Sequence, residues 1–190
     1  MGSQDPLHRE PIRPAVDESG QLVNPTGRPP FIQLRDDQPM RYAELLPSTT
    51  YLSPGFEYLT DTAAMPARVR GALRVVAPGD RVRHSTVQRD VGRSGDGVDD
   101  RYHGGHIVAV SLGGYASGPN LFPQAGNFNQ GAFARLEHSW RHALQEGCTV
   151  EVDIALAEGD DPATPSFLIV THWEDGTEET LTFINEGHML

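Results

Sequence analysis

The sequence predicts an α+β fold with an antiparallel sheet and one main helix, and two features of its C-terminal half carry this prediction. Apolar side chains recur at helical spacing between residues 130 and 146, which is typical of an amphipathic helix. Three segments of strand character follow at residues 149–157, 166–173 and 178–184, and Asp175-Gly176 is a strong hairpin signal. A helix followed by strands that pair antiparallel indicates the α+β class.

The ends of the predicted helix are marked by Asn129, a favourable N-cap residue, and by Gly147, a favourable stop. Upstream, residues 56–58 and 69–76 have β-branched, partly alternating character, so they predict a strand pair. An apolar run at residues 106–112 predicts another short strand. Residues 92–97 are glycine-rich and predict a loop, and turn-forming residues predict an irregular path for 115–128.

The N-terminal part of the chain is rich in proline, with nine prolines in residues 1–55. This density disfavours long helices and predicts an extended arm or linker, with a short helix near residues 40–46 and a short strand at 31–34. The first six residues resemble an expression-vector leader, and no signal-peptide pattern follows them. We therefore expect a leader and arm over residues 1–55 and one domain over residues 56–190.

Charge is distributed unevenly along the chain, whose formal net charge is −11. Residues 137–190 contain 12 acidic residues and one arginine, whereas residues 61–136 contain nine arginines and six acids. The arginine-rich middle can therefore face phosphates although the whole chain is acidic. Cys148 is the only cysteine, which excludes an intrachain disulfide and a cysteine-based metal site. No apolar run approaches the ~18 residues of a membrane span.

Four ordered segments carry the chemistry. They are Asp-Asp-Arg-Tyr-His-Gly-Gly-His-Ile (99–107), Ser-Leu-Gly-Gly (111–114), Asn-Leu-Phe-Pro-Gln (120–124) and Asn-Phe-Asn-Gln-Gly-Ala-Phe-Ala-Arg-Leu-Glu (127–137). Together they resemble the DNA/RNA non-specific endonuclease family of ββα-metal nucleases. The nearest branch is found as C-terminal toxin domains of bacterial secreted effectors, among them type VII secretion and other polymorphic toxins. The resemblance covers roughly 130 residues and implies a ββα-metal core with one crossing helix.

The resemblance also implies roles for individual residues. His106 matches the general base that activates water, and Asn129 matches the direct Mg²⁺ ligand at the start of the crossing helix. Glu137 matches the acid that holds a metal-bound water, and Asn120 matches the asparagine that supports the site. A histidine suits the base because its ordinary pKa is near 6.5, so activity is expected to fall below about pH 6.

Other residues are assigned on charge and position. Arg89 and Arg93 are candidates for clamping phosphate, because a guanidinium group matches phosphate oxygens in shape and charge. The surface interpretation of both arginines stays open. Asp99 and Asp100 are interpreted as loop acids.

The family pattern breaks at His103, where members often have an acidic residue or arginine. His103 and His106 also form a His-x-x-His pair, which leaves a zinc site as an alternative. Asn129 has an alternative interpretation as a helix cap alone, and Glu137 as a surface acid.

These observations predict an endonuclease that hydrolyses DNA, and RNA as a second substrate, with Mg²⁺ or a related cation such as Mn²⁺. Contacts made mainly to phosphates would give little sequence selectivity. The resemblance further implies an antibacterial effector toxin that is secreted or delivered into a target cell as part of a larger protein, with a cognate immunity protein. The alternatives are a secreted scavenging nuclease and a catalytically inactive ββα-metal module that binds a protein.

Overall fold

The computed structural model describes residues 15–16, 22–23, 31–94, 102–126, 131–157 and 164–185. Its main element is a seven-stranded sheet with the strand order β11-β10-β9-β6-β5-β4-β3. In chain order these strands are β3 (Phe31–Gln33), β4 (Thr50–Ser53), β5 (Phe56–Thr60), β6 (Pro66–Ala72), β9 (Val150–Ala157), β10 (Phe167–Glu174) and β11 (Thr177–Ile184). A separate pair joins β1 (Ala15–Val16) to β2 (Leu22–Val23).

Strand pairing in the large sheet is antiparallel, except that β3 runs parallel to β4 at one edge. The neighbours β6 and β9 come from distant parts of the chain, since residues 73–149 lie between them. This insert carries α1 (Ser85–Ser94), β7 (Tyr102–His106), β8 (Leu121–Ala125) and α3 (Ala132–Gln145), and β7 pairs antiparallel with β8. Short 3-10 helices lie at Tyr42–Glu44, Pro78–Asp80, Val110–Leu112 and Gly118–Asn120.

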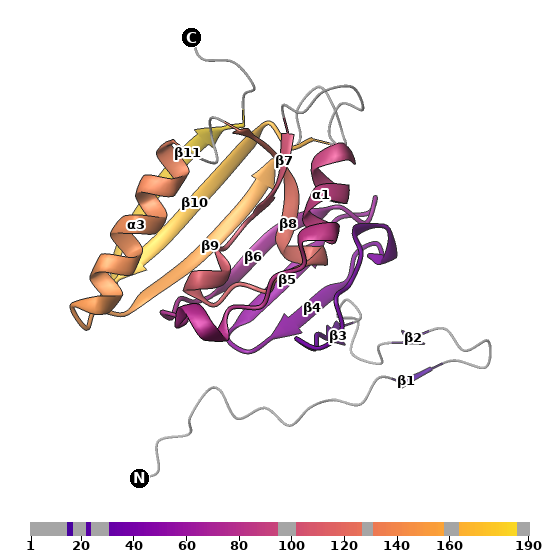
Figure 1. The fold of residues 1–190 in the computed structure, drawn as a ribbon, viewed down its shortest axis with the longest axis horizontal. Helices are drawn as coiled ribbons and strands as arrows, with labels where there is room; N and C mark the ends of the chain where they lie inside the picture. Colours follow the sequence, from indigo (N-terminus) through magenta and orange to yellow (C-terminus); the bar gives the residue numbers. More distant parts are fainter. Residues whose placement is uncertain are drawn as a thin grey trace.

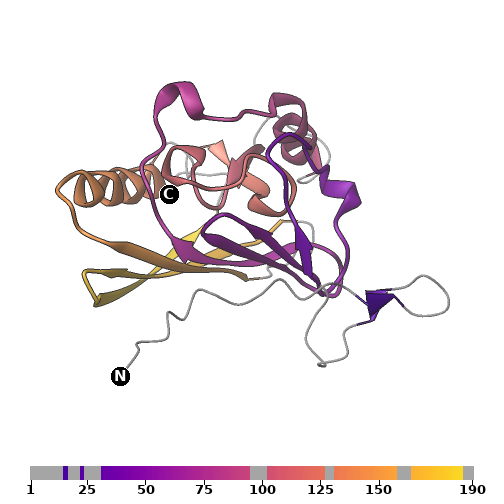
Figure 2. The ribbon, with the colours of Figure 1, turned by 90° about the horizontal axis from the view of Figure 1, so that it is seen from below.

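The insert covers one face of the large sheet. Figure 1 shows α3 crossing beside β9–β11 and α1 beside the β7–β8 pair, and Figure 2 shows that all four lie on the same side. Phe133 and Trp140 of α3 are almost fully buried, and their rings meet edge to face at 6.3 Å. They belong to the same core as Val152 and Val170 of the sheet. This packing fixes which face of α3 turns toward the β7–β8 pair.

Several sequence predictions are confirmed. The three C-terminal strands, the strand pair at β5 and β6, the short strand β3 and a short helical turn near residue 43 are all present. Asp175 and Gly176 have φ of 47° and 82°, the left-handed values that a tight hairpin turn requires. The main helix ends before Gly147, whose φ of 92° is a typical helix stop. The predicted N-cap Asn129 lies outside the described residues.

Three local predictions are wrong. Residues 92–94 belong to the helix α1 and not to the loop predicted over 92–97, whose remaining residues lie outside the described part of the chain. The strand expected at 106–112 is shifted, because β7 ends at His106 and the apolar residues after it form a buried loop. The segment 115–128, expected to be irregular, contains the buried strand β8. In each case contacts distant in sequence decide the local structure.

The boundary expected at residue 56 also differs from the structure. Strands β3 and β4 belong to the large sheet, and Leu34, Leu45 and Tyr51 are buried in its core. Residues 31–55 are therefore part of the domain and not of an arm.

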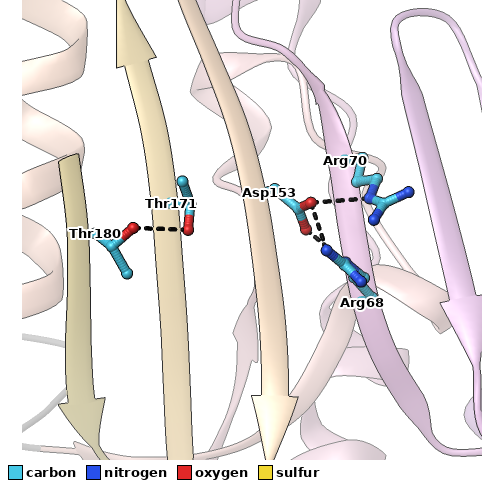
Figure 3. A network of polar contacts seen from close by, with 5 residues as sticks. All are labelled: Arg68, Arg70, Asp153, Thr171 and Thr180. Carbon is cyan, nitrogen blue, oxygen red and sulfur yellow. Dashed lines mark hydrogen bonds and ion pairs between the residues drawn. The ribbon is translucent and has the colours of Figure 1, made fainter. Parts of the chain in front are cut away.

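The opposite face of the sheet carries a polar network (Figure 3). Arg68 and Arg70 of β6 both bind Asp153 of β9, with Nε–oxygen distances of 2.6 and 2.9 Å. Further along the sheet, Thr171 and Thr180 share a hydrogen bond of 3.0 Å between β10 and β11. These bonds link neighbouring strands on the face that the insert does not cover. None of the helices described is long and apolar enough to cross a membrane.

Candidate active site

A pocket of about 280 Å³ lies where α1, the end of β7, the following loop and α3 meet. Its lining combines two arginines, one amide, one histidine and one carboxylate with a short stretch of loop. The lining residues are Arg81, Arg83, Gln88, His106, Ala109, Val110, Ser111 and Glu137. The pocket thus brings together His106 and Glu137, two of the residues predicted to carry the chemistry.

His106 is the last residue of β7 and is half-buried. Its Nδ1 lies 3.4 Å from Nε2 of Gln88, and its Nε2 lies 3.4 Å from the carbonyl oxygen of Ala116. Burial lowers the pKa of His106 to about 4, with a further lowering from the charge of Arg83 and an opposing effect of the Ala116 carbonyl. The imidazole is therefore neutral at physiological pH, as a general base must be.

Glu137 reaches the pocket from α3, on the other side from His106. Burial raises the pKa of its carboxyl group to about 7, although the charge of Arg141 and the Ala109 N–H both act to lower it. Arg141 also donates a hydrogen bond to Ser111, which lines the same pocket. Glu137 is thus a carboxylate whose burial is only partly compensated by its surroundings.

Asn120 is fully buried beside the pocket and does not line it. Its Oδ1 accepts from the Val108 N–H at 3.0 Å, and its Nδ2 donates to the carbonyls of Val108 and Tyr115 at 2.8 and 2.6 Å. These three bonds close the loop that directly follows His106. The Asn120 amide thus binds the backbone of this loop on both of its polar atoms.

A family model described as DNA/RNA non-specific endonuclease matches residues 47–176. The chain belongs to this family. It is therefore an enzyme that hydrolyses nucleic acids. No curated protein matches the chain.

Two solved structures support the fold assignment. NucA from Streptococcus agalactiae with magnesium bound is 15% identical, with a TM-score of 0.50 over 69% of this chain and 72% of NucA. The structure of NucA with no metal bound is 16% identical, with a TM-score of 0.51 over 80% of this chain and 74% of NucA. At this identity the likeness shows the fold alone, which is the predicted ββα-metal nuclease architecture.

The two arginines predicted to clamp phosphate in this endonuclease lie outside the pocket. Arg89 and Arg93 are exposed on α1, whereas Arg81 and Arg83, in the segment leading into α1, line the pocket. The sequence showed an excess of arginine in this region but had no motif that distinguished one pair from the other. Sequence reasoning also missed Gln88 and Ser111, whose residue types are common on any surface.

Three predicted residues cannot be placed. Asn129, the expected metal ligand, and the acids Asp99 and Asp100 lie outside the described residues. His103 is described, is exposed on β7, and is three residues from His106. Side chains three apart on a strand point to opposite faces, which argues against a shared zinc site. The described ranges contain no group of three or more His, Cys, Asp or Glu residues that could hold a metal.

A second hollow, of about 850 Å³, runs along the solvent side of α3. Its lining includes His138, His142 and Glu146, and it contains none of the predicted site residues. It is larger than the pocket at His106, so size alone does not identify the active site here.

Proposed function

We propose that this endonuclease cleaves DNA, and RNA as a second substrate, with His106 as the general base and a divalent cation, Mg²⁺ or Mn²⁺, as cofactor. One observation carries the proposal. One small pocket is lined by the neutral imidazole of His106 and by the Glu137 carboxylate, whose burial is only partly compensated. These two residues are 31 positions apart in the sequence, and Arg81 and Arg83 line the same pocket. This is the combination that phosphodiester hydrolysis requires: a base for water and positive charge for the phosphoryl group.

The pocket suits a hard cation on the side of Glu137. The raised pKa of Glu137 means that the positive charge around its carboxylate does not fully compensate for burial. Mg²⁺ would supply such charge, because it takes oxygen ligands while keeping several of its waters. Glu137 would hold such a cation through a bound water, and Asn129 would be its direct ligand, as the family resemblance implies. When bound, the cation would neutralise charge that develops on the phosphoryl group. NucA, which shares the fold, has been crystallised with magnesium.

The protein's own residues divide the remaining work. His106 accepts the proton of the attacking water, because it is neutral and lies at the pocket wall. Arg81 and Arg83 bind phosphate oxygens and thereby orient the scissile group. Asn120 keeps the loop after His106 in place through its three backbone bonds. Contacts of this type position phosphates without reading bases, which accounts for low sequence selectivity.

The test is plasmid degradation by the wild-type protein with Mg²⁺, with EDTA, and by His106→Ala with Mg²⁺. Cleavage is expected only in the first reaction, with a loss of about 10²–10⁴-fold for the alanine variant. Robust cleavage by His106→Ala would exclude the proposed mechanism. No cleavage by the wild type would favour the inactive protein-binding module.

The pH dependence is a second test. The base works only when neutral, so the rate falls as pH drops through its pKa. Because burial lowers the pKa of His106 to about 4, the decline is expected below about pH 5 and not near pH 6, where an ordinary histidine would place it. Initial rates between pH 4 and 8 at saturating Mg²⁺ distinguish the two. The carboxyl group of Glu137, whose pKa is raised to about 7, titrates in the same range, so the profile is repeated with Glu137→Gln. A midpoint near 6.5 that persists in this variant would contradict the effect of burial on His106.

We further propose that the enzyme is an antibacterial effector toxin, delivered outside the producing cell and blocked there by an immunity protein. This rests on the resemblance of residues 99–137 to the toxin branch of the family. Expression in the bacterial cytoplasm should arrest growth for the wild type and not for His106→Ala. Harmless expression of an active enzyme would instead favour a secreted scavenging nuclease.

A further inference from the structure

Helix α3 carries two histidines on the side that faces away from the active-site pocket. His138 and His142 are both exposed, and both line the hollow of about 850 Å³ along the solvent side of the helix. The residues directly before them turn to the other side: Glu137 lines the active-site pocket, and Arg141 binds Ser111 there. Successive residues of a helix differ by about 100° in direction, which accounts for the separation. The proposed hydrolysis does not use His138 or His142.

The spacing of these two histidines lets their imidazoles bind one cation. Side chains four positions apart in a helix lie on the same face, with about 5–6 Å between their Cβ atoms. Each imidazole nitrogen must come within about 2.0–2.1 Å of a Zn²⁺ ion. The helical His-Glu-x-x-His motif binds zinc through two histidines at this same spacing. His103 and His106 differ, because they lie three apart on a strand and point to opposite faces.

The backbone of α3 already holds the two histidines at this spacing. The helix runs from Ala132 to Gln145, and Phe133 and Trp140 fix its inner side in the core (Figure 1). Among the described residues, neither imidazole has a hydrogen bond or ion pair that a cation would have to displace. Binding therefore requires only that two exposed side chains turn toward each other.

The charge of the hollow favours a cation. Glu146 and Glu174 line it, against one arginine, Arg135. Within the described ranges, no three histidine, cysteine or acidic side chains lie close enough together to hold a metal. The two acids therefore act through their charge from a longer distance, and water would complete the coordination of a cation held by the imidazoles.

The donor atoms favour Zn²⁺ over the Mg²⁺ proposed for the active site. Imidazole nitrogen suits Zn²⁺ and neighbouring transition metals, whereas Mg²⁺ takes oxygen ligands. Cys148 also lines the hollow, but desolvation and the neighbouring carboxylates, Asp175 above all, raise the pKa of its thiol. The thiolate is the form that binds metals, so Cys148 is not assigned as a ligand.

We propose that His138 and His142 form a Zn²⁺ site on the outer face of α3, separate from the cation site of the active-site pocket. With two protein ligands and water in the remaining positions, this ion exchanges more readily than one in a closed four-ligand site. By joining two turns of α3, it stabilises the helix that carries Glu137 without entering the active-site pocket.

Zn²⁺ binding is measured by isothermal titration calorimetry at pH 7.5, with His106→Ala as the parent and excess Mg²⁺ present. The parent lacks the active-site imidazole, and Mg²⁺ competes for the oxygen ligands there, so the site on α3 is observed by itself. Adding His138→Ala or His142→Ala should weaken binding by at least about 10–100-fold, the loss that removal of an outer-shell partner alone can cause. Unchanged affinity in either variant would overturn the proposal.

A control with the same number of histidines tests the spacing. His142→Ala combined with Ser139→His leaves two imidazoles on the hollow, but at adjacent positions whose side chains do not face each other. This variant should bind Zn²⁺ as weakly as His142→Ala alone, and recovery of the parental affinity would show that spacing is irrelevant. His103→Ala removes an exposed histidine of β7 and should leave binding unchanged. A loss there would place the zinc site on β7 instead.

Thermal melting gives a second measurement that does not depend on activity. Zn²⁺ should raise the Tm of the parent and not that of its His142→Ala variant, because only a ligand bound to the folded state stabilises it. Alanine has the highest helix propensity, so both substitutions are expected to leave α3 folded. An equal rise of Tm in both proteins would contradict the proposal. Plasmid cleavage with Mg²⁺ by His138→Ala alone should match the wild type, and a large loss would refute the separation of the two sites.

Discussion

Two carboxylates on opposite sides of the sheet show how differently this fold treats the same chemical group. Burial would raise the pKa of Asp153, but the hydrogen bonds and charges of Arg68 and Arg70 outweigh that effect and lower it. Glu137 also loses water contact, yet Arg141 and the Ala109 N–H compensate incompletely, and its pKa rises to about 7. One carboxylate is paired within the fold, and the other is left short of positive charge.

The difference separates a carboxylate held in ion pairs within the fold from one that lines the proposed active site. Asp153 ties two strands together, and Arg68 and Arg70 bind both of its carboxylate oxygens. Glu137 lies in a pocket with His106, where an added cation would supply the missing charge. Strongly perturbed groups that line a pocket are typical of active sites, and such groups often lower the stability of the folded state. The comparison thus predicts opposite results for matched carboxylate-to-amide substitutions.

Glu137→Gln should have the largest effect on activity. Removing the charge should reduce cleavage by about 10–100-fold, because a water-mediated contact to the cation would be lost. Stability should be unchanged or higher without Mg²⁺, since a neutral amide is buried more easily than a charge. Plasmid cleavage and thermal melting with and without Mg²⁺ measure both. A large loss of stability with full activity would reverse the assignment.

Asp153→Asn should do the opposite: leave cleavage unchanged and lower the free energy of unfolding by about 1–2 kcal/mol. A carboxyl group whose folded pKa is lowered contributes stability above its unfolded pKa, near 3.8, and loses it as pH falls through the folded value. The gap between wild type and variant should therefore close at acidic pH. Urea unfolding at pH 7 and pH 3 tests this. A gap that persists unchanged at pH 3 would mean that charge is not its cause.

Arg83→Ala and Arg89→Ala compare a pocket arginine with an exposed one on α1. We expect kcat/KM to fall about 10-fold for Arg83→Ala and clearly less for Arg89→Ala. Each lost phosphate contact should also reduce the slope of log affinity against log salt by about 0.9. Binding of a non-cleavable duplex at several salt concentrations gives these slopes. Equal losses of kcat/KM in the two variants would indicate that Arg89 also contacts phosphate, as the sequence predicts.

The smallest effect is expected from Arg70→Ala. Its guanidinium is about half exposed, and Asp153 keeps its two bonds to Arg68. Exposed ion pairs of this kind contribute about 1 kcal/mol or less. Urea unfolding should detect a small loss, well below that of Asp153→Asn. A larger loss than for Asp153→Asn would show that Arg70 acts through packing.

Elements with a regular pattern could be predicted from the sequence. The spacing of Phe133 and Trp140 predicted α3, and Asp175-Gly176 predicted the β10–β11 turn, because periodicity and turn chemistry are local properties. Helix α1 has only Val87 and Val91 as buried apolar side chains, and the role of Gly92 is a contact with β7. A glycine that permits close packing has the same sequence signature as one in a loop. The tertiary contact alone separates them.

Residues of the candidate site could be predicted only where they lie in one of the four family-like segments. His106, Glu137 and Asn120 were named from ordered segments, and the first two do share a pocket. Arg81 and Gln88 were not named, because a surface arginine and glutamine carry no local signal. Their place in the pocket depends on how α1 and the segment before it pack against β7. The apolar residues after His106 indicated burial correctly, but burial alone does not distinguish a strand from a packed loop.

The pocket lies in the segment between β6 and β9, and this position affects how the enzyme folds during synthesis. Residues 73–149 must be enclosed by strands that are neighbours in space but far apart in the chain. Bringing the two ends of so long a segment together is entropically unfavourable and slow. Pairing of β6 with β9 must offset this cost. A nascent chain that has not yet reached β9 contains β3–β6 but lacks β9, β10 and β11, the strands beside which α3 lies. The pocket, which lies within this insert, therefore forms only after β9 has been synthesised.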